Sequence, residues 1–474
     1  MPTHKERLSV LLQTEGTYPY TGGGVSTWCD TLCRELPGVD FYVVAVTGDA
    51  NVTLRYNLPR NVRALIHVPL WGAEEPTEYI NTDQPFADVY LRKQSTTDEV
   101  VTRGFVPALR EFLRAMEDDA ADLWDVARAV TAMYDFVQRY DYTAALRSRP
   151  AWRAFLEESH RAYAAARHEY PADSQPSAYD FTTALRWLGH YLMVLNMPVP
   201  RVDVAHSSIG ASAALAGIVA KIKYGTPFLL TEHGVFIRER AIAVSQTGLS
   251  FYLKRFLIRM SALFSRLCFA LADQVSPVCD FNRRWELLYG AREEQLLTIY
   301  NGINPAVFVP RDKPPANRNI PTVVAAARVY PLKDILTMIQ SARIVREEIP
   351  NVRYVVYGSL SADPDYVAQC RALIAELNLE ETFKLAGFHA QPAEIYNEGD
   401  LSMLSSVSEG FPYTVIESMA CARPVVATDV GGVSEALKGH GVIVRPRDPA
   451  ALANGAITLL RNDGLRSYLG RKAR

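Results

Sequence analysis

Short apolar runs alternate with helix-like segments at the start of the chain. The runs RLSVLLQ (7–13), FYVVAV (41–46) and VRALIHV (62–68) have the length of buried strands, and apolar residues recur at helical spacing between 25 and 36. A glycine-rich loop, TEGTYPYTGGG (14–24), joins the first run to that helix. The alternation predicts parallel strands connected by helical crossovers.

Helical spacing replaces this alternation between about residues 73 and 197. Phe105, Leu109, Phe112 and Met116 fall on one helical face, and a second such series follows from Leu123. We therefore expect a helical insertion in the first domain. Its first part is acidic, with 13 Asp or Glu against five Lys or Arg between residues 71 and 125. Charge runs usually form solvated faces, and we interpret this one so.

The strand–helix alternation then resumes and fills the rest of a first domain, residues 1–310. A helix of small residues ends at Lys221, another helix is expected over about 250–272, and a third runs through Glu286. The strand-like runs between them are VDVAH (202–206), PFLLTEH (227–233), DQVSPV (273–278) and LLTIYNGI (296–303).

A stretch rich in Pro and Asn, 304–320, has no periodicity and predicts an interdomain linker. A second domain, 311–474, follows, with helix-like segments between five strand-like runs: 322–328, 352–358, 383–388, 400–406 and 424–429. The fold class is therefore α/β, with two Rossmann-like doubly wound domains that face each other across a cleft. Ligands of such domains lie beyond the carboxyl ends of the strands. No internal sequence repeat is visible.

Composition excludes several classes of protein. Of 474 residues, 49% are hydrophobic, which excludes a disordered or fibrous chain, and the net charge of −2 argues against a nucleic-acid binder. The longest uncharged small-residue run, 207–220, is too short to span a membrane, and no signal peptide is expected. Six cysteines without a C-x-x-C pair favour a reduced, cytoplasmic protein, in which Cys29 and Cys33 are buried thiols.

The first candidate site lies in SVSEGFPYTVIE (406–417), which leaves a strand and enters a helix near Pro412. Glu409 follows the strand, and Glu417 lies about one turn into the helix. A helix N-terminus suits phosphate, and carboxylates accept hydrogen bonds from sugar or ribose diols. Two glutamates at this spacing are weak evidence alone, but the strand–Gly–Pro–helix context strengthens them.

A second candidate, RVYPLKD (328–334), follows another strand of the same sheet. Arg328 and Lys333 could grip a diphosphate through a guanidinium fork and an ammonium group. The alternative is a surface salt bridge. Because this loop and the Glu409 loop leave the same sheet edge, the phosphate role is favoured.

Other residues leave two interpretations open. Gly22–Gly24 and Gly431–Gly432 allow close backbone approach to a ligand, or are only turns. His233, after the run PFLLTE, contacts a substrate or only completes a strand end. Arg255, Arg259 and Arg266 share one face of the helix over 251–271, which is either a membrane-facing surface or a solvated stripe. Asp363-Pro-Asp365 has the letters of a metal motif but begins a probable helix, so no metal is expected.

Together these motifs resemble the retaining glycosyltransferases of the GT-B fold, family four. The resemblance rests on Arg328, Lys333, EGFPYTVIE (409–417) and TDVGGVSEAL (428–437). In the first half, EGTYPYTGGGVSTW (15–28), TEHGVFIRER (231–240) and the helical insertion are similar to the Pel exopolysaccharide (PelF-like) subgroup.

The resemblance implies a retaining, metal-independent hexosyltransferase with no cofactor. It would move glucose or an N-acetylhexosamine from a UDP-sugar to a saccharide acceptor in exopolysaccharide biosynthesis, at the inner face of a membrane beside a polysaccharide synthase. Arg328 and Lys333 would hold the diphosphate, Glu417 the ribose, and Glu409 and His233 the transferred sugar. Backbone of Gly23, Gly24, Gly410, Phe411, Pro412 and Tyr413 would line the donor. A phosphorylase-type enzyme and a non-catalytic sugar-nucleotide-binding subunit are the alternatives.

Overall fold

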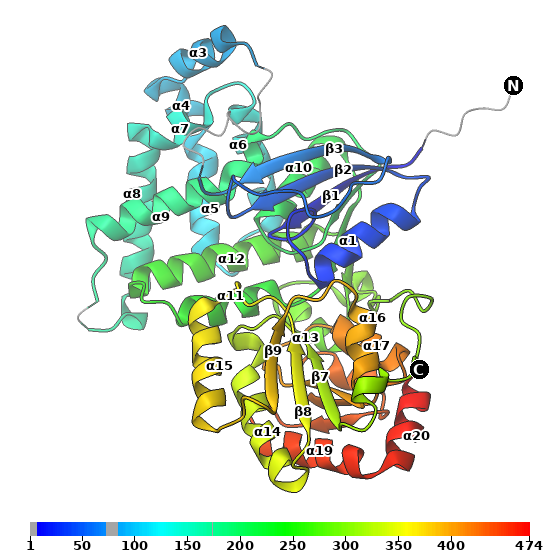
Figure 1. Ribbon diagram of the computed structural model, residues 1–474. Coiled ribbons are helices and arrows are strands. Elements are labelled where there is room, and N and C mark those ends of the chain that lie inside the picture. The colour runs from blue at the N-terminus through cyan, green and yellow to red at the C-terminus, as the bar shows by residue number, and fades with distance from the viewer. Residues whose placement is uncertain (1–6, 73–83, 173) are drawn as a thin grey trace, which may run out of the picture. The chain divides into compact units, whose positions relative to one another are not determined.

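The computed structural model describes residues 7–72, 84–172 and 174–474 (Figure 1). By internal contacts the chain divides into two compact units. The first comprises residues up to Pro277 together with Arg283–Thr298, and the second comprises Val278–Asn282 and Ile299–Arg474. Each unit is built around one parallel six-stranded sheet, as the sequence predicts.

The first sheet has the strand order β3-β2-β1-β4-β5-β6. Successive side chains of its central strands enter different cores: Leu11 packs in the core that continues into the helical insertion, whereas Val10 and Leu12 pack with α1 on the other face. Burial on both faces explains why these strands read as continuous apolar runs. The strands are β1 (Ser9–Glu15), β2 (Asp40–Thr47), β3 (Val62–Pro69), β4 (Val204–Ser207), β5 (Phe228–Glu232) and β6 (Gln274–Pro277).

The main helices outside the insertion cover this sheet or lead from its strands. They are α1 (Gly24–Glu35), α10 (Leu215–Tyr224), α11 (Phe236–Ser245), α12 (Phe251–Leu271) and α13 (Asp280–Leu288), with short 3₁₀ turns η3 (Ser212–Ala214) and η4 (Glu293–Gln295). The segment 296–303 is not a strand, contrary to the sequence prediction. Only Leu296 forms an isolated bridge, to Val275, and the apolar side chains of Leu297, Ile299 and Tyr300 are exposed.

The predicted insertion is helical from residue 86 to residue 196, and residues 73–83 lie outside the described structure (Figure 1). Several of its helices begin at side-chain caps, including Asp122, Ser148 and the capping box of Ser177 with Asp180. The elements are α3 (Phe86–Ser95), α4 (Asp98–Gly104), α5 (Val106–Glu117), α6 (Leu123–Val137), α7 (Tyr142–Arg147), α8 (Arg149–Ala165), η1 (Arg167–Glu169), α9 (Ala178–Tyr191) and η2 (Leu192–Asn196).

The basic stripe of α12 pairs with part of the acidic stretch, so the membrane-facing and the solvated interpretations of the stripe are both wrong. Asp118 and Asp119 of the acidic stretch are exposed, as predicted. Arg255 pairs with Glu117 at 2.6 Å, and Arg259 pairs with Asp119 at 3.1 Å. Arg266 donates to the carbonyl oxygen of Asp119 at 2.6 Å. The three arginine side chains are only 11–21% exposed. α12 therefore offers no basic face to a membrane.

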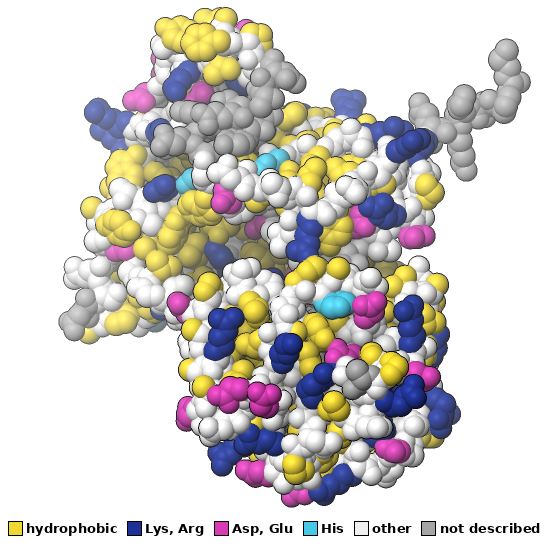
Figure 2. Space-filling view, viewed as in Figure 1, with side chains coloured by type: hydrophobic (Ala, Val, Ile, Leu, Met, Phe, Trp, Pro, Cys, Tyr) yellow, Lys and Arg dark blue, Asp and Glu magenta, His cyan; other side chains and the backbone are white. Residues whose placement is uncertain are grey.

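The insertion exposes apolar side chains at a different place. Helix α3 leaves Phe86, Tyr90 and Leu91 exposed (Figure 2). Among the described residues, no helix is long and apolar enough to cross a membrane.

The second sheet repeats the strand order of the first, as β12-β11-β10-β7-β8-β9. The strands are β7 (Thr322–Ala326), β8 (Arg353–Tyr357), β9 (Phe383–Gly387), β10 (Leu401–Leu404), β11 (Val425–Thr428) and β12 (Val442–Val444), of which sequence reasoning missed the last. Between them lie η5 (Pro315–Asn317), η6 (Pro331–Lys333), α14 (Ile335–Glu348), α15 (Pro364–Glu376), α16 (Pro392–Glu398), α17 (Tyr413–Ala420), α18 (Val433–Leu437), α19 (Pro449–Arg461) and α20 (Asp463–Ala473).

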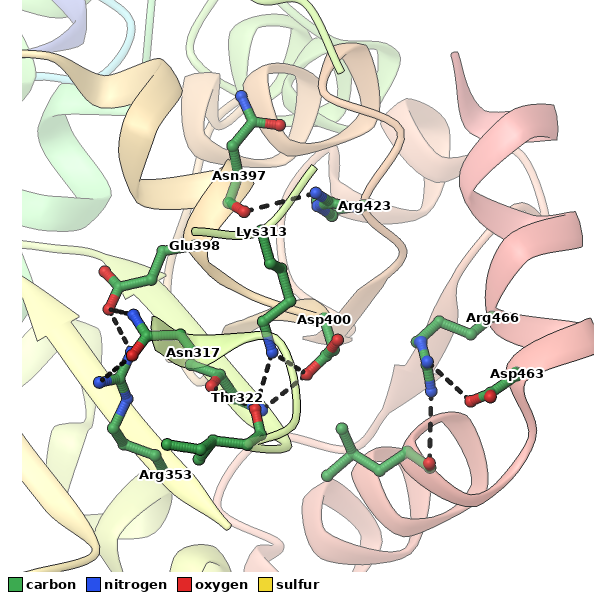
Figure 3. A network of polar contacts seen from close by, with 12 residues as sticks. Lys313, Asn317, Thr322, Arg353, Asn397, Glu398, Asp400, Arg423, Asp463 and Arg466 are labelled. Atoms are coloured by element: carbon green, nitrogen blue, oxygen red, sulfur yellow. Dashed lines mark hydrogen bonds and ion pairs between the residues drawn. The ribbon is translucent and has the colours of Figure 1, made fainter. Parts of the chain in front are cut away.

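A network of polar contacts ties the segment before β7 to the amino ends of the strands (Figure 3). Lys313 pairs with Asp400 at 2.7 Å and also donates to the carbonyl oxygen of Ile320. The same oxygen of Asp400 accepts the backbone N–H of Thr322, the first residue of β7. Arg353 and Glu398 form a neighbouring ion pair. The network leaves the opposite, carboxyl edge of the sheet as the place for ligands.

Candidate functional site

Two loops meet at the carboxyl edge of the second sheet, one after β7 and one after β10. The backbone N–H of Val407 donates to the carbonyl oxygen of Leu332 at 2.9 Å, and the Ser405 hydroxyl donates to that of Lys333 at 2.8 Å. These bonds join the two loops that the sequence singled out. Because both bonds end on backbone carbonyl groups of the first loop, they fix the backbone of that loop against the loop after β10.

Lys333 and Glu409 form an ion pair across these loops. Their Nζ and Oε1 atoms are 2.5 Å apart, and the side chains are 18% and 10% exposed. Burial lowers the pKa of Lys333, but the nearby Glu409 carboxylate outweighs it, so the net shift is upward. The lysine is therefore charged at neutral pH, and it presents a fixed cation at the sheet edge.

Glu409 uses only one of its two oxygens within the described structure. Oε1 accepts from Lys333 and from the Ser406 hydroxyl, while Oε2 accepts no hydrogen bond from a described residue. A carboxylate has about four acceptor positions. Glu409 therefore retains capacity for hydroxyl groups of a ligand.

The turn at Gly431 and Gly432 packs against the Glu409 loop. A Cβ atom on Gly431, whose φ is +58°, would lie 1.9 Å from the carbonyl oxygen of Glu409. The N–H of Gly432 donates to the carbonyl oxygen of Gly410 at 2.7 Å. This turn thus needs glycine for close backbone packing, and it fixes the path of residues 409 and 410.

Arg328 lies two residues beyond β7 and is exposed. Its guanidinium carbon is 4.9 Å from the centre of the Tyr330 ring, a cation–π distance. Its charge opposes the upward shift of the pKa of Lys333. Two cations therefore act at one point of the edge, where a doubly charged anion would relieve their repulsion.

Helix α17 starts beside these cations. Pro412 is its N-cap and makes no side-chain cap. Phe411 is a core residue: its side chain is buried, and its carbonyl oxygen accepts from the Asn301 side chain at 3.0 Å. Of Phe411, the backbone N–H is thus the group that can serve a ligand.

Glu417, the fifth residue of α17, is held by a tyrosine that sequence reasoning missed. The buried Tyr396 hydroxyl donates to Glu417 Oε2 at 2.6 Å. Burial raises the pKa of Glu417, and the tyrosine hydrogen bond opposes that increase. Tyr396 lies in α16, and nothing in the sequence of that helix indicates that its tyrosine contacts Glu417.

In the first unit, Gly23 and Gly24 lie where α1 begins. Gly23 is the N-cap, with φ +148°, and makes no side-chain cap. A Cβ atom on Gly23 would meet nothing within 4 Å, so the positive φ, and not steric crowding, favours glycine at this position. Without a side chain, Gly23 also leaves the N-terminus of α1 accessible. The neighbouring Gly22 is packed differently, because its Cβ would lie 2.8 Å from the Arg55 guanidinium.

His233 follows β5 and packs against α1. Its ring centre lies 4.9 Å from that of Trp28, and Trp28 also contacts His206 edge-on at 5.4 Å. Burial lowers the pKa of His233 to about 3, with a smaller contribution from His206. The imidazole is therefore neutral. His206 ends the predicted run VDVAH just as His233 ends PFLLTEH, a shared position that could have identified it.

Two buried carboxyl groups lie near this edge of the first sheet and were also missed. Glu286 is fully buried, and neither of its oxygens has a hydrogen-bond partner among the described residues. Burial raises its pKa to about 8. Glu232 is also buried, and burial followed by the charge of Glu286 raises its pKa as well. Glu286 is therefore largely protonated at neutral pH.

Arg328, Lys333 and Glu409 thus converge on one edge of the second sheet, with Glu417 one turn into the adjoining helix. Gly23, Gly24 and His233 belong to the first unit, where Trp28 links α1 to His233. Asp363 is the N-cap of α15 and Asp365 lies in its first turn, as expected. No group of three or more metal-ligating side chains occurs among the described residues.

Both units have the Rossmann-like strand order of the GT-B fold, and sequence comparison places the chain in a family. The chain belongs to the family described as Domain of unknown function (DUF3492), whose sequence model matches residues 8–294. Residues 310–474 match the model described as Glycosyl transferases group 1. The second domain is therefore of the glycosyltransferase group 1 type.

Curated relatives carry glycosyltransferase names. The chain is 29% identical over 298 residues to the D-inositol 3-phosphate glycosyltransferase of Acidothermus cellulolyticus. The aligned region covers 57% of this chain and 62% of that protein. It is 27% identical to D-inositol 3-phosphate glycosyltransferase 1 of Catenulispora acidiphila, over 59% of this chain and 68% of that protein. The chain thus spans about two thirds of the length of these relatives.

Solved structures share the fold over nearly the whole chain. HepE of Anabaena, in complex with UDP and glucose, superposes with a TM-score of 0.58 at 16% identity, covering 98% of this chain and 93% of that one. Sucrose-phosphate synthase of Thermosynechococcus elongatus gives a TM-score of 0.59 at 16% identity, with the same coverage. These likenesses establish the GT-B fold that the sequence predicted.

Proposed function

We propose that the chain is a retaining, metal-independent hexosyltransferase that transfers glucose or an N-acetylhexosamine from a UDP-sugar to a saccharide or polysaccharide acceptor. The observation that carries this proposal is the Lys333–Glu409 pair at the carboxyl edge of the second sheet, with Arg328 beside it. The glycosyl transferases group 1 match over the same domain supports it.

In this proposal the two cations bind the diphosphate of the donor. Arg328 is exposed and Lys333 is fixed by its loop, so a diphosphate can bridge them without rearranging the backbone. Their charges also stabilise the negative charge that develops on the departing UDP, a role that a divalent metal has in other enzymes. The start of α17, with residues 410–413, adds backbone N–H groups and the positive end of a helix dipole.

The carboxylates bind the hydroxyl groups of the donor. Glu417 accepts from the ribose through the oxygen that Tyr396 leaves unused, and Glu409 accepts from the transferred sugar through Oε2. Backbone of Gly23 and Gly24 contacts the diphosphate, and His233 contacts the transferred sugar as a neutral imidazole. The assignments come from the family resemblance, and the unused oxygens of Glu409 and Glu417 support the two carboxylate roles.

Transfer then proceeds on one face of the sugar. The bond from the anomeric carbon to the UDP oxygen breaks, and the acceptor oxygen bonds to the same carbon from the same side. The acceptor proton passes to the departing phosphate oxygen, so no protein nucleophile is needed. Biosynthesis of an exopolysaccharide in the cytoplasm, beside a membrane synthase, is the setting we infer from the PelF-like motifs of the first half.

A thermal-shift panel without metal tests the donor site. UDP, ADP, GDP, UDP-glucose, UDP-galactose and the UDP-N-acetylhexosamines are compared in the presence of a chelator. A ligand at about 100 times its dissociation constant adds about 2.7 kcal/mol of stability, a shift of several degrees. We expect UDP and one UDP-sugar to stabilise the protein selectively.

Variants and product analysis complete the test. Lys333→Ala should lose the UDP-dependent shift, whereas Arg343→Ala, which removes an exposed arginine paired with Glu347 in the same domain, should keep it. The anomeric configuration of the product, read by NMR, tests retention. No shift with any nucleotide, or a shift that needs a divalent metal, would overturn the proposal.

A further inference from the structure

A cavity of about 540 Å³ lies within the helical insertion, among α7, α8, α9 and η2. These helices pack side by side at one side of the first unit (Figure 1). The cavity walls are mostly apolar and include Leu146, Trp152, Leu185 and Met193. None of its lining residues belongs to the candidate donor site, so the proposed function does not account for it.

Two arginines line this apolar cavity. Arg147 is the last residue of α7, Arg186 lies in α9, and both are exposed. Within the described ranges neither guanidinium forms an ion pair or hydrogen bond, although other arginines of the insertion do. Arg110 and Arg114, for example, both bind the buried carboxylate of Glu158. Arg147 and Arg186 thus keep their full donor capacity.

The remaining polar groups of the cavity do not neutralise these charges. No acidic side chain of the described residues lines it. His190 lines it as well, and its pKa is lowered to about 4 by burial and by the charges of Arg186 and Arg147, so the ring is neutral. The Tyr142 hydroxyl is already committed to the carbonyl oxygen of Gly189. The cavity therefore combines apolar walls with two unneutralised cations.

His190 connects the cavity to the first sheet. Its ring packs on that of Trp71 at a centre-to-centre distance of 4.1 Å, and Trp71 lies two residues beyond β3. The carboxyl edge of a doubly wound sheet is where ligands bind. One lining residue of the cavity thus contacts the loop that leaves the carboxyl end of β3.

We propose that this cavity binds one molecule of an anionic amphiphile, a phosphate monoester whose hydrocarbon chain lies against the apolar walls. Arg147 and Arg186 bind the phosphate, for which guanidinium forks are suited. Burial of the chain supplies the rest of the affinity, since apolar surface leaves water. A free sugar is less suited, because few hydroxyl or amide groups of the walls remain to pair with its hydroxyls.

Titration calorimetry with alkyl phosphates tests this proposal on the full chain. Hexyl, octyl and decyl phosphate are compared as monomers, below their aggregation concentrations, with the corresponding alkanols and with inorganic phosphate. We expect saturable binding of one molecule per chain, and an affinity that rises about fourfold per added methylene, which corresponds to 0.8 kcal/mol. Inorganic phosphate should bind too weakly to measure, and each alkanol should bind more weakly than its phosphate.

Variants separate this site from non-specific surfactant binding. The double variant Arg147→Gln/Arg186→Gln should lower decyl phosphate affinity at least tenfold and leave decanol affinity unchanged. Arg153→Gln removes an exposed arginine of α8 that does not line the cavity, and it should change neither. UDP-dependent stabilisation should be the same in all three proteins, so this proposal and the donor-site proposal fail independently.

Several outcomes would overturn the inference. Binding without a defined stoichiometry, affinity that is independent of chain length, or equal affinity in the double variant would each do so. Binding only to vesicles that contain phosphatidic acid, with no binding of monomeric alkyl phosphate, would identify a membrane surface instead. Because both arginines are exposed and have no partner among the described residues, the double variant should fold, and its unfolding temperature without ligand checks this.

Discussion

The second domain contains two lysine–carboxylate pairs of similar geometry at opposite edges of one sheet. Lys313 and Asp400 are 2.7 Å apart, and Lys333 and Glu409 are 2.5 Å apart. All four side chains are less than one-fifth exposed. Proximity and burial therefore do not distinguish the two pairs.

What distinguishes them is the number of acceptors that each lysine already binds and the edge of the sheet at which each pair lies. Lys313 also binds a backbone carbonyl, and Asp400 also binds the start of β7, so the first pair is engaged in joining the linker to the sheet (Figure 3). In each pair one carboxylate oxygen accepts two bonds and the other accepts none from a described residue. Lys333, however, has no second acceptor among the described residues, and its pair lies at the carboxyl edge, near Arg328. An ion pair thus indicates a ligand site where its lysine keeps unused donor groups and the pair lies at the ligand-binding edge of the sheet.

The largest effect on stability should come from Lys313→Ala. The substitution leaves Asp400 buried without its cation, and such a loss typically costs about 3–5 kcal/mol. Denaturant unfolding should show this decrease in the free energy of unfolding, while Lys333→Ala, next to an edge that water can reach, should lose less.

A double variant checks the cause. Lys313→Met/Asp400→Asn removes both charges but keeps an acceptor for the N–H of Thr322, so it should recover much of the stability. If Lys333→Ala destabilised the domain more than Lys313→Ala, the distinction between the two pairs would be wrong.

Turnover should show the reverse ranking. Lys333→Ala removes a fixed cation from the departing diphosphate and should lower the rate of UDP release from the UDP-sugar by about 10²–10³-fold. Arg343→Ala serves as the matched control and should keep the full rate. Undiminished turnover in Lys333→Ala would remove this lysine from the site.

A buried carboxyl group that forms no ion pair with any described residue extends the comparison to the first domain. The pKa of Glu286 is raised to about 8, so its contribution to stability is fully present below about pH 4.5 and is lost as the pH rises through 8. Glu286→Gln should abolish this loss, which amounts to roughly 4 kcal/mol between pH 5 and pH 8.5 at 1.36 kcal/mol per pKa unit.

The exposed Glu376 provides the control, since Glu376→Gln should leave the pH dependence of thermal unfolding unchanged. Equal pH profiles for Glu286→Gln and the unsubstituted protein would mean that Glu286 is ionised by some partner at neutral pH.

The smallest effect should come from Tyr396→Phe, which deletes one hydrogen bond to Glu417. Loss of such a bond costs about 0.5–1.5 kcal/mol. UDP affinity should fall about three- to tenfold, because Glu417 is less well positioned, while the maximal rate with saturating donor stays the same. A fall in that rate with unchanged affinity would contradict the positioning role.

Much of the fold could be predicted from the sequence because buried parallel strands are continuous apolar runs. The exceptions are informative. The run 296–303 has the same composition, yet it has no neighbouring strand beyond the single bridge of Leu296, and burial cannot be deduced from hydrophobicity alone. β12 has only three residues, too few to form a recognisable pattern.

The candidate site could be predicted only for residues whose position directly after a strand determines where they lie in the fold. Arg328, Lys333 and Glu409 follow strands, so their sheet edge is fixed by topology. The pairing of Arg255 with Glu117 joins residues far apart in the sequence, and local pattern gave each charge a solvated role instead. The roles of Tyr396 and Glu286 could not be predicted for the same reason, because each depends on residues that are distant in the sequence and pack against it in the fold.

The most direct test of the central claim is the dissociation constant of UDP, measured by calorimetry without metal, for the unsubstituted protein and for Lys333→Ala. If the carboxyl-edge pair is the donor site, the substitution should weaken UDP binding at least tenfold while the protein stays folded. Equal dissociation constants for the two proteins would show that the Lys333–Glu409 pair is structural, like Lys313–Asp400.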